Sequence, residues 1–345
     1  MRPAPGALHL LPLTGLPEVQ EGADVAALLG TALERWGGLL DGDVLVVSGK
    51  VLSKAHGLRE HAAREEAVAR HTVRVVAERT TAHGTTQVVE SLAGPVLAAA
   101  GVDASNTGPR GGVLLLPADP DAAARDLHQQ LAARVPGVAF GLVLSDTAGR
   151  PWRAGQTDFA LGAHGVRVLD DLRGGFDVDG RPLAVTARAV GDELAAAADL
   201  VKGKADAVPA ALLRGLSDLV DPSATGARAL VRTGPGDWFA LGHQEAVRAA
   251  LGAAPGTDQA RFVGVPDVVP EPADARAARA VRLALLNQPG AEVVGRHGQG
   301  YTVHAADPVL AGRVAARLEV ALAGEGLHAA VNVPAPDQLS GWPAP

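Results

Sequence analysis

The sequence predicts a mixed α/β fold built in two parts, and three observations support this. Its 345 residues exceed one average domain and suggest two. Hydrophobic residues make up 47% of the chain but aromatic residues only 3%, so we expect a core of Ala, Val and Leu. Short apolar runs alternate with longer segments whose apolar residues recur at helical spacing.

Composition excludes several classes of protein. A net charge of −7 argues against a general nucleic-acid binder. The sequence contains no cysteine, which excludes disulfides, thiolate zinc sites and cysteine nucleophiles. No window approaches the ~20 apolar residues of a membrane span, and the N-terminal apolar patch is too short for a signal peptide. We therefore expect a cytoplasmic protein without nucleic-acid or membrane partners.

Strands and helices are expected to alternate in the first part. The strand candidates are aliphatic or β-branched runs at residues 8–13, 44–47, 113–116, 138–144 and 183–188. The helix candidates cover residues 24–36, 60–79, 122–134 and 192–200. A hairpin-like turn is expected at residues 177–180.

A composition shift at residues 233–242 marks a boundary, so the expected domains are residues 1–236 and 237–345. The second domain is expected to be small and α/β, followed by a Pro-rich tail. Its expected elements are helices at 273–287 and 307–323 and short strands at 293–294, 301–304 and 329–333. We find no constellation of chemical groups in it.

The apolar run at 138–144 leads into a dense group of polar side chains. Asp146 offers a carboxylate and Thr147 a hydroxyl where α/β sheets commonly bind ligands, and both suit Mg²⁺ or Mn²⁺. Four further polar groups follow: Arg150, Arg153, Gln156 and Asp158. The alternative is a helix N-cap, although Pro151 argues against a continuing helix.

Two loops carry lysines beside glycine. After the second strand, Gly49 with Lys50 and Lys54 could cradle a phosphate, and Lys202 and Lys204 could do the same later in the chain. A solvated loop with surface lysines is the alternative.

A carboxylate and an amide, Asp103 and Asn106, precede a Gly-rich turn and can face one ligand, unless they only form an Asx-turn. Together with Asp146, Thr147 and the lysine loops, they are the equipment for a metal–nucleotide complex. The residues alone leave kinase, ligase and nucleotidase open. A Rossmann oxidoreductase is not expected, because no Gly-x-Gly-x-x-Gly follows a first strand.

Six motifs in order resemble those of the coenzyme F420-0:L-glutamate ligase family. They are GLPEV at 15–19, GDVLVVSGKVLSKAHG at 42–57, GVDASN at 101–106, LLLPADPD at 114–121, SDTAGRPWRAGQTD at 145–158 and DELAAAADLVKGKADAVPAALLRG at 192–215. The resemblance implies a GTP-dependent ligase that adds L-glutamate to coenzyme F420-0 through an acyl phosphate, with release of GDP and phosphate. It also implies a two-part ligase fold and a homodimer.

The resemblance further implies the site residues. The metal ligands would be Asp103, Asp146 and Thr147, holding one or two Mg²⁺ or Mn²⁺ ions with K⁺ assisting. The GTP contacts would be Leu16, Pro17, Glu18, Val19, Gly49, Lys50, Lys54, Asn106, Lys202, Gly203, Lys204, Ala205, Asp206, Ala207, Val208 and Pro209. We assign catalytic roles to Asp146, Arg150 and Arg153.

The chain departs from the family's pattern at Lys204, where a member can place a metal-binding side chain, because a charged ammonium cannot bind a cation. The last 100 or so residues are short for the flavin-binding domain that some relatives carry. Two alternatives stay open: a ligase with another carboxylate acceptor such as a folate, and a nucleotide-binding protein that has lost catalysis.

Overall fold

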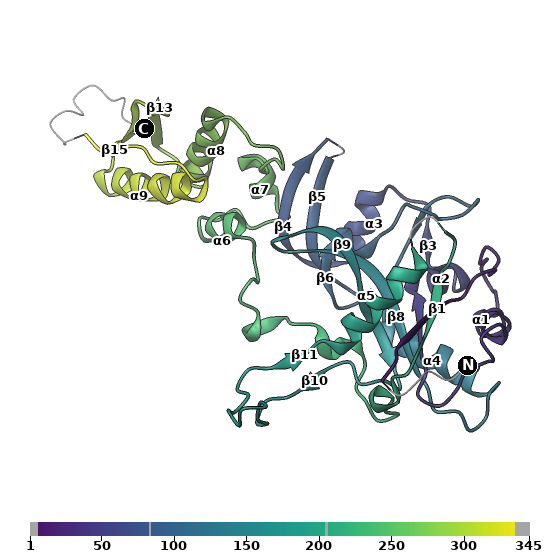
Figure 1. Ribbon diagram of the computed structural model, residues 1–345. Helices are drawn as coiled ribbons and strands as arrows, with labels where there is room; N and C mark the ends of the chain where they lie inside the picture. The colour runs from purple at the N-terminus through teal and green to yellow at the C-terminus, as the bar shows by residue number, and fades with distance from the viewer. Residues whose placement is uncertain (1–5, 83, 204–205, 335–345) are drawn as a thin grey trace. The chain divides into compact units, whose positions relative to one another are not determined.

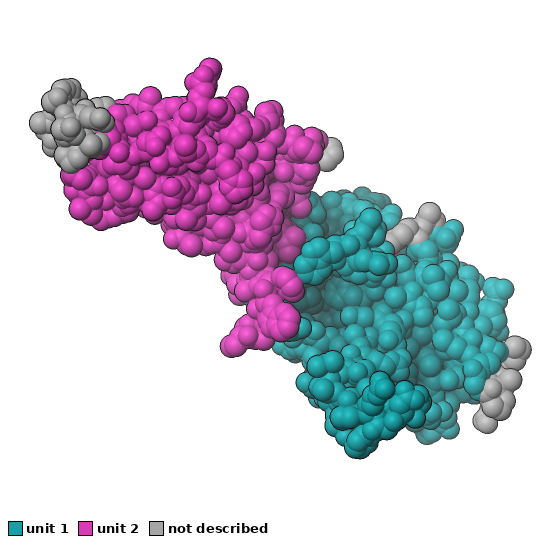
Figure 2. Space-filling view, turned by 60° about the vertical axis from the view of Figure 1, so that its left-hand side comes forward, with its two compact units in different colours: residues 1–72, 90–233 teal, residues 73–89, 234–345 magenta. Residues whose placement is uncertain are grey.

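The computed structural model describes residues 6–82, 84–203 and 206–334. Contacts divide the chain into two units (Figures 1 and 2): unit 1 comprises residues 1–72 and 90–233, and unit 2 comprises residues 73–89 and 234–345. Residues 73–89 therefore group with the C-terminal unit. The single boundary expected between residues 236 and 237 does not include this excursion of the chain.

Unit 1 is built on a five-stranded sheet (Figure 1). Its strands, in spatial order, are β1 (His9–Pro12), β12 (Ala210–Arg214), β2 (Val44–Ser48), β8 (Gly141–Arg150) and β9 (Arg153–His164). The pair β2–β8 is parallel and the other three pairs are antiparallel. The expected strand at 138–144 is longer than predicted, because it continues through the polar group to Arg150 and turns back as β9.

Helices cover both faces of this sheet because its central strands are apolar on both sides. Leu45 and Val47 of β2 pack with one cluster, and Val44 and Val46 pack with another. The first cluster includes residues of α1 (Val25–Glu34), α2 (Gly49–Ala55) and α4 (Pro120–Ala132), and the second those of α5 (Val190–Lys202). The predicted α/β class is confirmed.

Two local predictions in unit 1 are wrong. The segment that carries Lys50 and Lys54 is expected to be a loop, but it forms helix α2 directly after β2. Residues 183–188 are expected to be one strand, but only Ala187–Arg188 (β11) pairs, with Asp170–Asp171 (β10). The remaining elements of unit 1 are β3 (Arg59–Glu60), α3 (Arg64–Arg70), β6 (Val96–Ala98), β7 (Val113–Leu114) and the short 3₁₀ turns Ala99–Gly101, Ser217–Leu219 and Ala227–Leu230.

Unit 2 contains a hairpin and a small α/β body. The hairpin is β4 (Thr72–Thr81) and β5 (Gly84–Ser91), so the helix expected at 60–79 ends at Arg70 and a strand replaces its second half. In the body, β14 (Gly300–Ala305) lies between β13 (Ala291–Arg296) and β15 (Val331–Asn332). Its helices are α6 (His243–Ala250), α7 (Asp258–Val263), α8 (Ala273–Leu285) and α9 (Pro308–Gly324). The predicted helices and strands of this part are confirmed, and α6 and α7 are additional.

A short 3₁₀ turn, Gly234–Gly236, begins the C-terminal segment of unit 2. Throughout the ranges that the structure describes, we find no helix with the length and apolar character needed to cross a membrane.

Candidate active site

A cavity of about 900 Å³ lies within unit 1, where the carboxyl ends of β2 and α5 meet the β8–β9 hairpin. It gathers most of the residues that the sequence predicts. The predicted residues that line it are Leu16, Pro17, Glu18, Val19, Lys50, Lys54, Asp103, Asn106, Asp146, Thr147, Lys202, Gly203, Ala207, Val208 and Pro209. Five of the six motifs of the sequence contribute all of this list, and only the motif at 114–121 is absent from it.

Other predicted residues lie elsewhere. Gly49 is buried and does not line the cavity, and a Cβ added to it would lie 3.0 Å from Leu161. Arg150 and Arg153 are exposed on the turn between β8 and β9 and do not line the cavity. Asp206 is exposed and is also absent from the cavity lining. Lys204 and Ala205 lie outside the described residues.

The two lysines of α2 are each paired with an acid of the cavity. Lys50 Nζ lies 2.5 Å from Asp103 Oδ2 and donates to the carbonyl of Ser105 at 3.1 Å. Lys54 Nζ lies 2.5 Å from Glu18 Oε1. Burial acts to raise the pKa of Asp103, but hydrogen bonds from Lys50 and Ser105 outweigh it and hold this pKa below its usual range. Each lysine can therefore exchange the carboxylate that it now pairs with for a phosphate oxygen of a ligand.

Asp146 has a different electrostatic environment. Burial raises its pKa to about 6, and the carboxylates of Asp158 and Asp103 add to the shift, while the Thr147 amide and Lys50 oppose it. Burial, together with the two neighbouring carboxylates, disfavours an ionised Asp146 unless a cation binds. This is the environment expected of a metal ligand before the metal is bound.

Asp158 and Lys202 form a buried ion pair beside Thr147, each with a side chain only 4% exposed. Lys202 Nζ donates to Asp158 Oδ2 at 2.6 Å and to Ser145 Oγ at 2.7 Å. Burial acts to raise the pKa of Asp158, but the Lys202 ammonium and hydrogen bonds from Thr147 and Ser145 hold it below its usual range. The sequence predicts Lys202 as a phosphate ligand, yet its ammonium is turned into the protein.

The metal donors that the sequence predicts are two carboxylates and a hydroxyl, and all three line the cavity. No group of three or more His, Cys, Asp and Glu side chains suited to a metal occurs among residues 6–82, 84–203 and 206–334. Mg²⁺ and Mn²⁺ commonly take one or two carboxylates and complete their shell with water and phosphate oxygens. The donor set of Asp103, Asp146 and Thr147 fits such an ion.

Several polar residues that line the cavity are not predicted as site residues from the sequence. They are Ser48, Arg64, Ser105, Asp199, Gln156 and Asp158, of which the last two are expected only as polar groups. Asp199 is the residue three positions before Lys202 on α5, so helical periodicity at the end of that helix could have indicated it. Arg64 begins α3 and carries no signal in the sequence that distinguishes it from the exposed arginines around it.

An α/β unit whose cavity combines two acids, a hydroxyl and paired lysines is typical of enzymes that handle phosphoryl groups with a divalent cation. Residues 15–215 match the model of the family described as F420-0:gamma-glutamyl ligase. This match covers more than half of the chain, and the protein belongs to that family.

Curated relatives agree with this assignment. A coenzyme F420:L-glutamate ligase of Methanopyrus kandleri is 37% identical over 256 residues, which cover 68% of this chain and 99% of the relative. The enzyme of the same name from Archaeoglobus fulgidus is 36% identical, covering 61% of this chain and 88% of its own. That from Halobacterium salinarum is 39% identical, covering 58% and 83%.

Proposed function

We propose that this protein is a GTP-dependent ligase that joins L-glutamate to coenzyme F420-0 through an amide bond and releases GDP and phosphate. The observation that carries the proposal is the cavity of about 900 Å³, which gathers Asp103, Asp146, Thr147, Lys50 and Lys54 from separate motifs. The names of the archaeal relatives support this choice of substrates.

Asp103, Asp146 and Thr147 would hold Mg²⁺ or Mn²⁺, as one or two ions, with K⁺ as a further cation. When bound, such an ion neutralises charge on the phosphoryl oxygens. A second ion is the less supported part of this proposal, because Lys204 stands where a member of the family can have a metal-binding side chain. Lys204 lies outside the described part of the chain.

In the proposed reaction, an oxygen of the acceptor carboxylate attacks the γ-phosphorus of GTP, GDP leaves and an acyl phosphate forms. The deprotonated amine of L-glutamate then attacks the acyl carbon, and phosphate leaves as the amide forms. Lys50 and Lys54 would bind phosphate oxygens in exchange for Asp103 and Glu18, which become available to a metal or to a substrate amine. Apolar lining residues, among them Val51 and Leu97, would limit the access of water to the acyl phosphate.

Arg150 and Arg153 lie on the exposed turn between β8 and β9, at the edge of the cavity. Their neighbours on these strands, Gly149 and Gln156, line the cavity. We keep the catalytic assignment of these two arginines as a proposal, since guanidinium groups bind carboxylates and phosphates by bidentate contacts. We also propose a cytoplasmic location, which a cysteine-free sequence and GTP as co-substrate support.

The proposed homodimer is supported by an arm of unit 1. Residues 170–188, which include β10 and β11, form this arm (Figure 1). Phe176 is exposed by 70%, Val178 by 102% and Val185 by 87%. Apolar side chains exposed together mark an interaction surface. We expect wild type to sediment as a dimer and the double variant Val178→Asp with Val185→Asp to sediment as a monomer. A wild-type monomer would contradict the proposed dimer.

The function is tested with purified protein, GTP, Mn²⁺, K⁺, L-glutamate and F420-0, following phosphate release and product mass together. We expect the acceptor to gain the mass of one or more glutamates only when GTP and a divalent metal are present. Phosphate release without that gain would keep the nucleotide chemistry and assign another acceptor, such as a folate. The absence of both signals would indicate a protein that has lost catalysis.

A further inference from the structure

The Lys202–Asp158 pair is costly for its place in the protein. Both side chains are 4% exposed, and Ser145, which joins them, is fully buried. Removing two charges from water costs several kcal/mol per ion, so a buried ion pair is often no more stabilising than an apolar pair of the same size. Its presence at the wall of the cavity therefore requires a reason besides stability.

The geometry connects this pair to one predicted metal ligand. Thr147 lies directly opposite Asp158 in the β8–β9 register, and its Oγ1 donates to Asp158 Oδ1 at 2.6 Å. The other oxygen, Asp158 Oδ2, accepts from Ser145 Oγ at 2.9 Å and from Lys202. A hydroxyl has one proton and two lone pairs, so Thr147, having given its proton to Asp158, can offer a cation only lone pairs.

Both oxygens of Asp158 accept hydrogen bonds, and an amide side chain offers only one accepting oxygen. With Asn at this position, the NH₂ group would face either the ammonium of Lys202 or the hydroxyl of Thr147. Facing Thr147, it would make Oγ1 an acceptor, and the hydroxyl proton would turn elsewhere. Lys202, at the last residue of α5, balances the charge of Asp158 and fixes its rotation from the opposite side.

We propose that Asp158 and Lys202 are positioning residues that orient the Thr147 hydroxyl as a ligand of the divalent metal. The inference rests on the metal-dependent function proposed above and adds to it two residues that do not touch the metal. Hydrogen-bonded partners of metal ligands typically contribute 10–100-fold to metal affinity. The same range is expected here.

The test measures Mn²⁺ binding to the full-length protein without any substrate, by the EPR signal of free Mn²⁺. We expect Asp158→Asn and Thr147→Val each to weaken Mn²⁺ affinity about 10–100-fold. We expect Thr147→Ser, which keeps the hydroxyl, to bind within about threefold of wild type. Because Asp158 acts through Thr147, the double variant should bind no more weakly than Thr147→Val alone.

A second buried ion pair of the same sheet provides the matched control. Asp43 and Arg214, at the start of β2 and the end of β12, are hydrogen-bonded at 2.8 and 2.9 Å and have exposed fractions of 0% and 2%. Asp43 lies at the opposite end of β2 from Ser48, which pairs with Ser145. Asp43→Asn should lower the melting temperature and leave Mn²⁺ affinity within about twofold of wild type.

The possible outcomes separate this inference from the function on which it rests. If wild type binds no Mn²⁺, both the metal-dependent function and the positioning role fail. If wild type binds Mn²⁺ but folded Asp158→Asn binds it equally well, or if the two losses add in the double variant, only the positioning role is overturned. If Asp158→Asn does not fold, Lys202→Gln replaces it, and about tenfold weaker binding is expected; unchanged binding overturns the proposal.

Discussion

Charged side chains are buried in both units, but they are paired differently. In unit 2, Arg279 Nη1 and Nη2 donate to the two oxygens of Glu271 at 2.7 Å, and its Nε and Nη2 donate to Glu325 at the same distance. In unit 1, burial raises the pKa of Asp146 to about 6 and two neighbouring carboxylates add to it. A buried charge that serves stability, such as that of Arg279, is paired with opposite charges of the protein. A buried acid that serves binding, such as Asp146, requires a cation from solution to pair with it.

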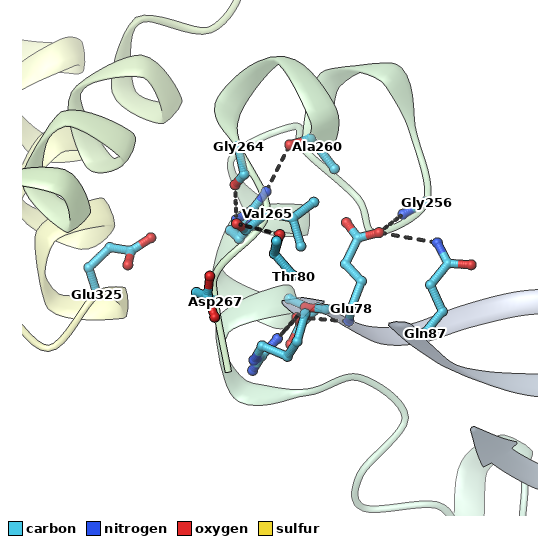
Figure 3. Close-up of polar contacts among 12 residues, drawn as sticks. Glu78, Thr80, Gln87, Gly256, Ala260, Gly264, Val265, Asp267 and Glu325 are labelled. Atoms are coloured by element: carbon cyan, nitrogen blue, oxygen red, sulfur yellow. Dashed lines mark hydrogen bonds and ion pairs between the residues drawn. The ribbon is translucent and has the colours of Figure 1, made fainter. Parts of the chain in front are cut away.

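Figure 3 shows the polar contacts of Glu78 that attach the hairpin of unit 2 to its C-terminal segment. Glu78 Oε2 accepts from the Gly256 amide at 3.2 Å and from Gln87 at 3.3 Å. Arg79 pairs with Glu245. Thr80 Oγ1 donates to the carbonyl of Val265 at 3.5 Å (Figure 3). These contacts join distant parts of the sequence, and they lie in a unit whose described residues form no metal-binding cluster.

The largest effect is expected from Asp146, the buried acid whose pKa is raised beside two other carboxylates. Asp146→Asn should lower ligase turnover more than about 100-fold, because loss of a ligand should cost more than loss of a group that only supports one. Asp192→Asn is the control, since Asp192 is a half-buried acid of the same unit that accepts from the Ala160 amide at 2.9 Å. Equal turnover of the two variants, measured by phosphate release at matched folded fractions, would contradict the role of Asp146.

The reverse is expected in unit 2. Arg279→Met should destabilise the protein by about 3–5 kcal/mol, because two carboxylates lose their charged partner at a buried position. Turnover per folded molecule should stay near that of wild type. Urea unfolding and the ligase assay measure the two quantities, and loss of turnover without loss of stability would show that the ion cluster has a catalytic rather than a structural role.

Asp146 of unit 1 and Glu271 of unit 2 should contribute to the pH dependence of stability with opposite signs. The folded pKa of Asp146 is raised from 3.8 to about 6, so its contribution to stability is full below pH 4 and is lost as pH rises through 6. Hydrogen bonds from Arg279 lower the pKa of Glu271, so its contribution is present above its unfolded pKa and is lost as pH falls.

Metal-free protein provides the measurement for Asp146. Between pH 4 and 7, the difference in unfolding free energy between wild type and Asp146→Asn should fall by up to about 3 kcal/mol. Saturating Mn²⁺ should reverse the trend, since the metal favours the ionised acid. A difference that does not change with pH would refute the raised pKa.

The smallest effect is expected from the half-buried pair Lys50–Asp103. Lys50→Met should tighten Mn²⁺ binding up to about fivefold in the absence of nucleotide, because Lys50 competes with the metal for Asp103 and such pairs contribute up to about 1 kcal/mol. GTP should bind more weakly. Lys54→Met is the control, since Lys54 pairs with Glu18: it should weaken GTP binding and leave Mn²⁺ binding unchanged. Titration calorimetry that shows equal Mn²⁺ affinities for the two variants would exclude the competition.

The sequence predicts the sheet and helices of unit 1 well where one periodicity dominates, as in β2 and α1. It fails at residues 72–81, where Thr, Val and charged side chains alternate. The preceding seven-residue helix also combines Val and Ala with charged side chains, so the sequence shows no break between the two segments. Helical spacing alone therefore extends the predicted helix into the strand. Pairing with β5 decides for the strand, and pairing is a property of the folded chain.

The site shows the same limit. The acids and hydroxyl of the cavity are predicted because motifs mark them, and the structure brings Asp103, Asp146 and Thr147 to one cavity. The orientation of Lys202 could not be predicted, because a lysine in a Gly-rich segment has the same sequence whether it faces solvent or a buried acid. Its partner is apparent only in the folded chain, where Lys202 Nζ donates to Asp158 Oδ2 at 2.6 Å.

The membership of residues 73–89 in unit 2 has a consequence for dissecting the protein genetically. A gene truncated after codon 233 would encode every residue of the cavity but would remove Gly256, Glu245 and Val265, the partners of the hairpin. Glu78, now 3% exposed, would then meet water, and Val75, whose Cγ2 would lie 2.7 Å from a Cβ added at Gly256, would lose this apolar cover. Domain swaps between relatives should therefore exchange the hairpin together with the C-terminal segment.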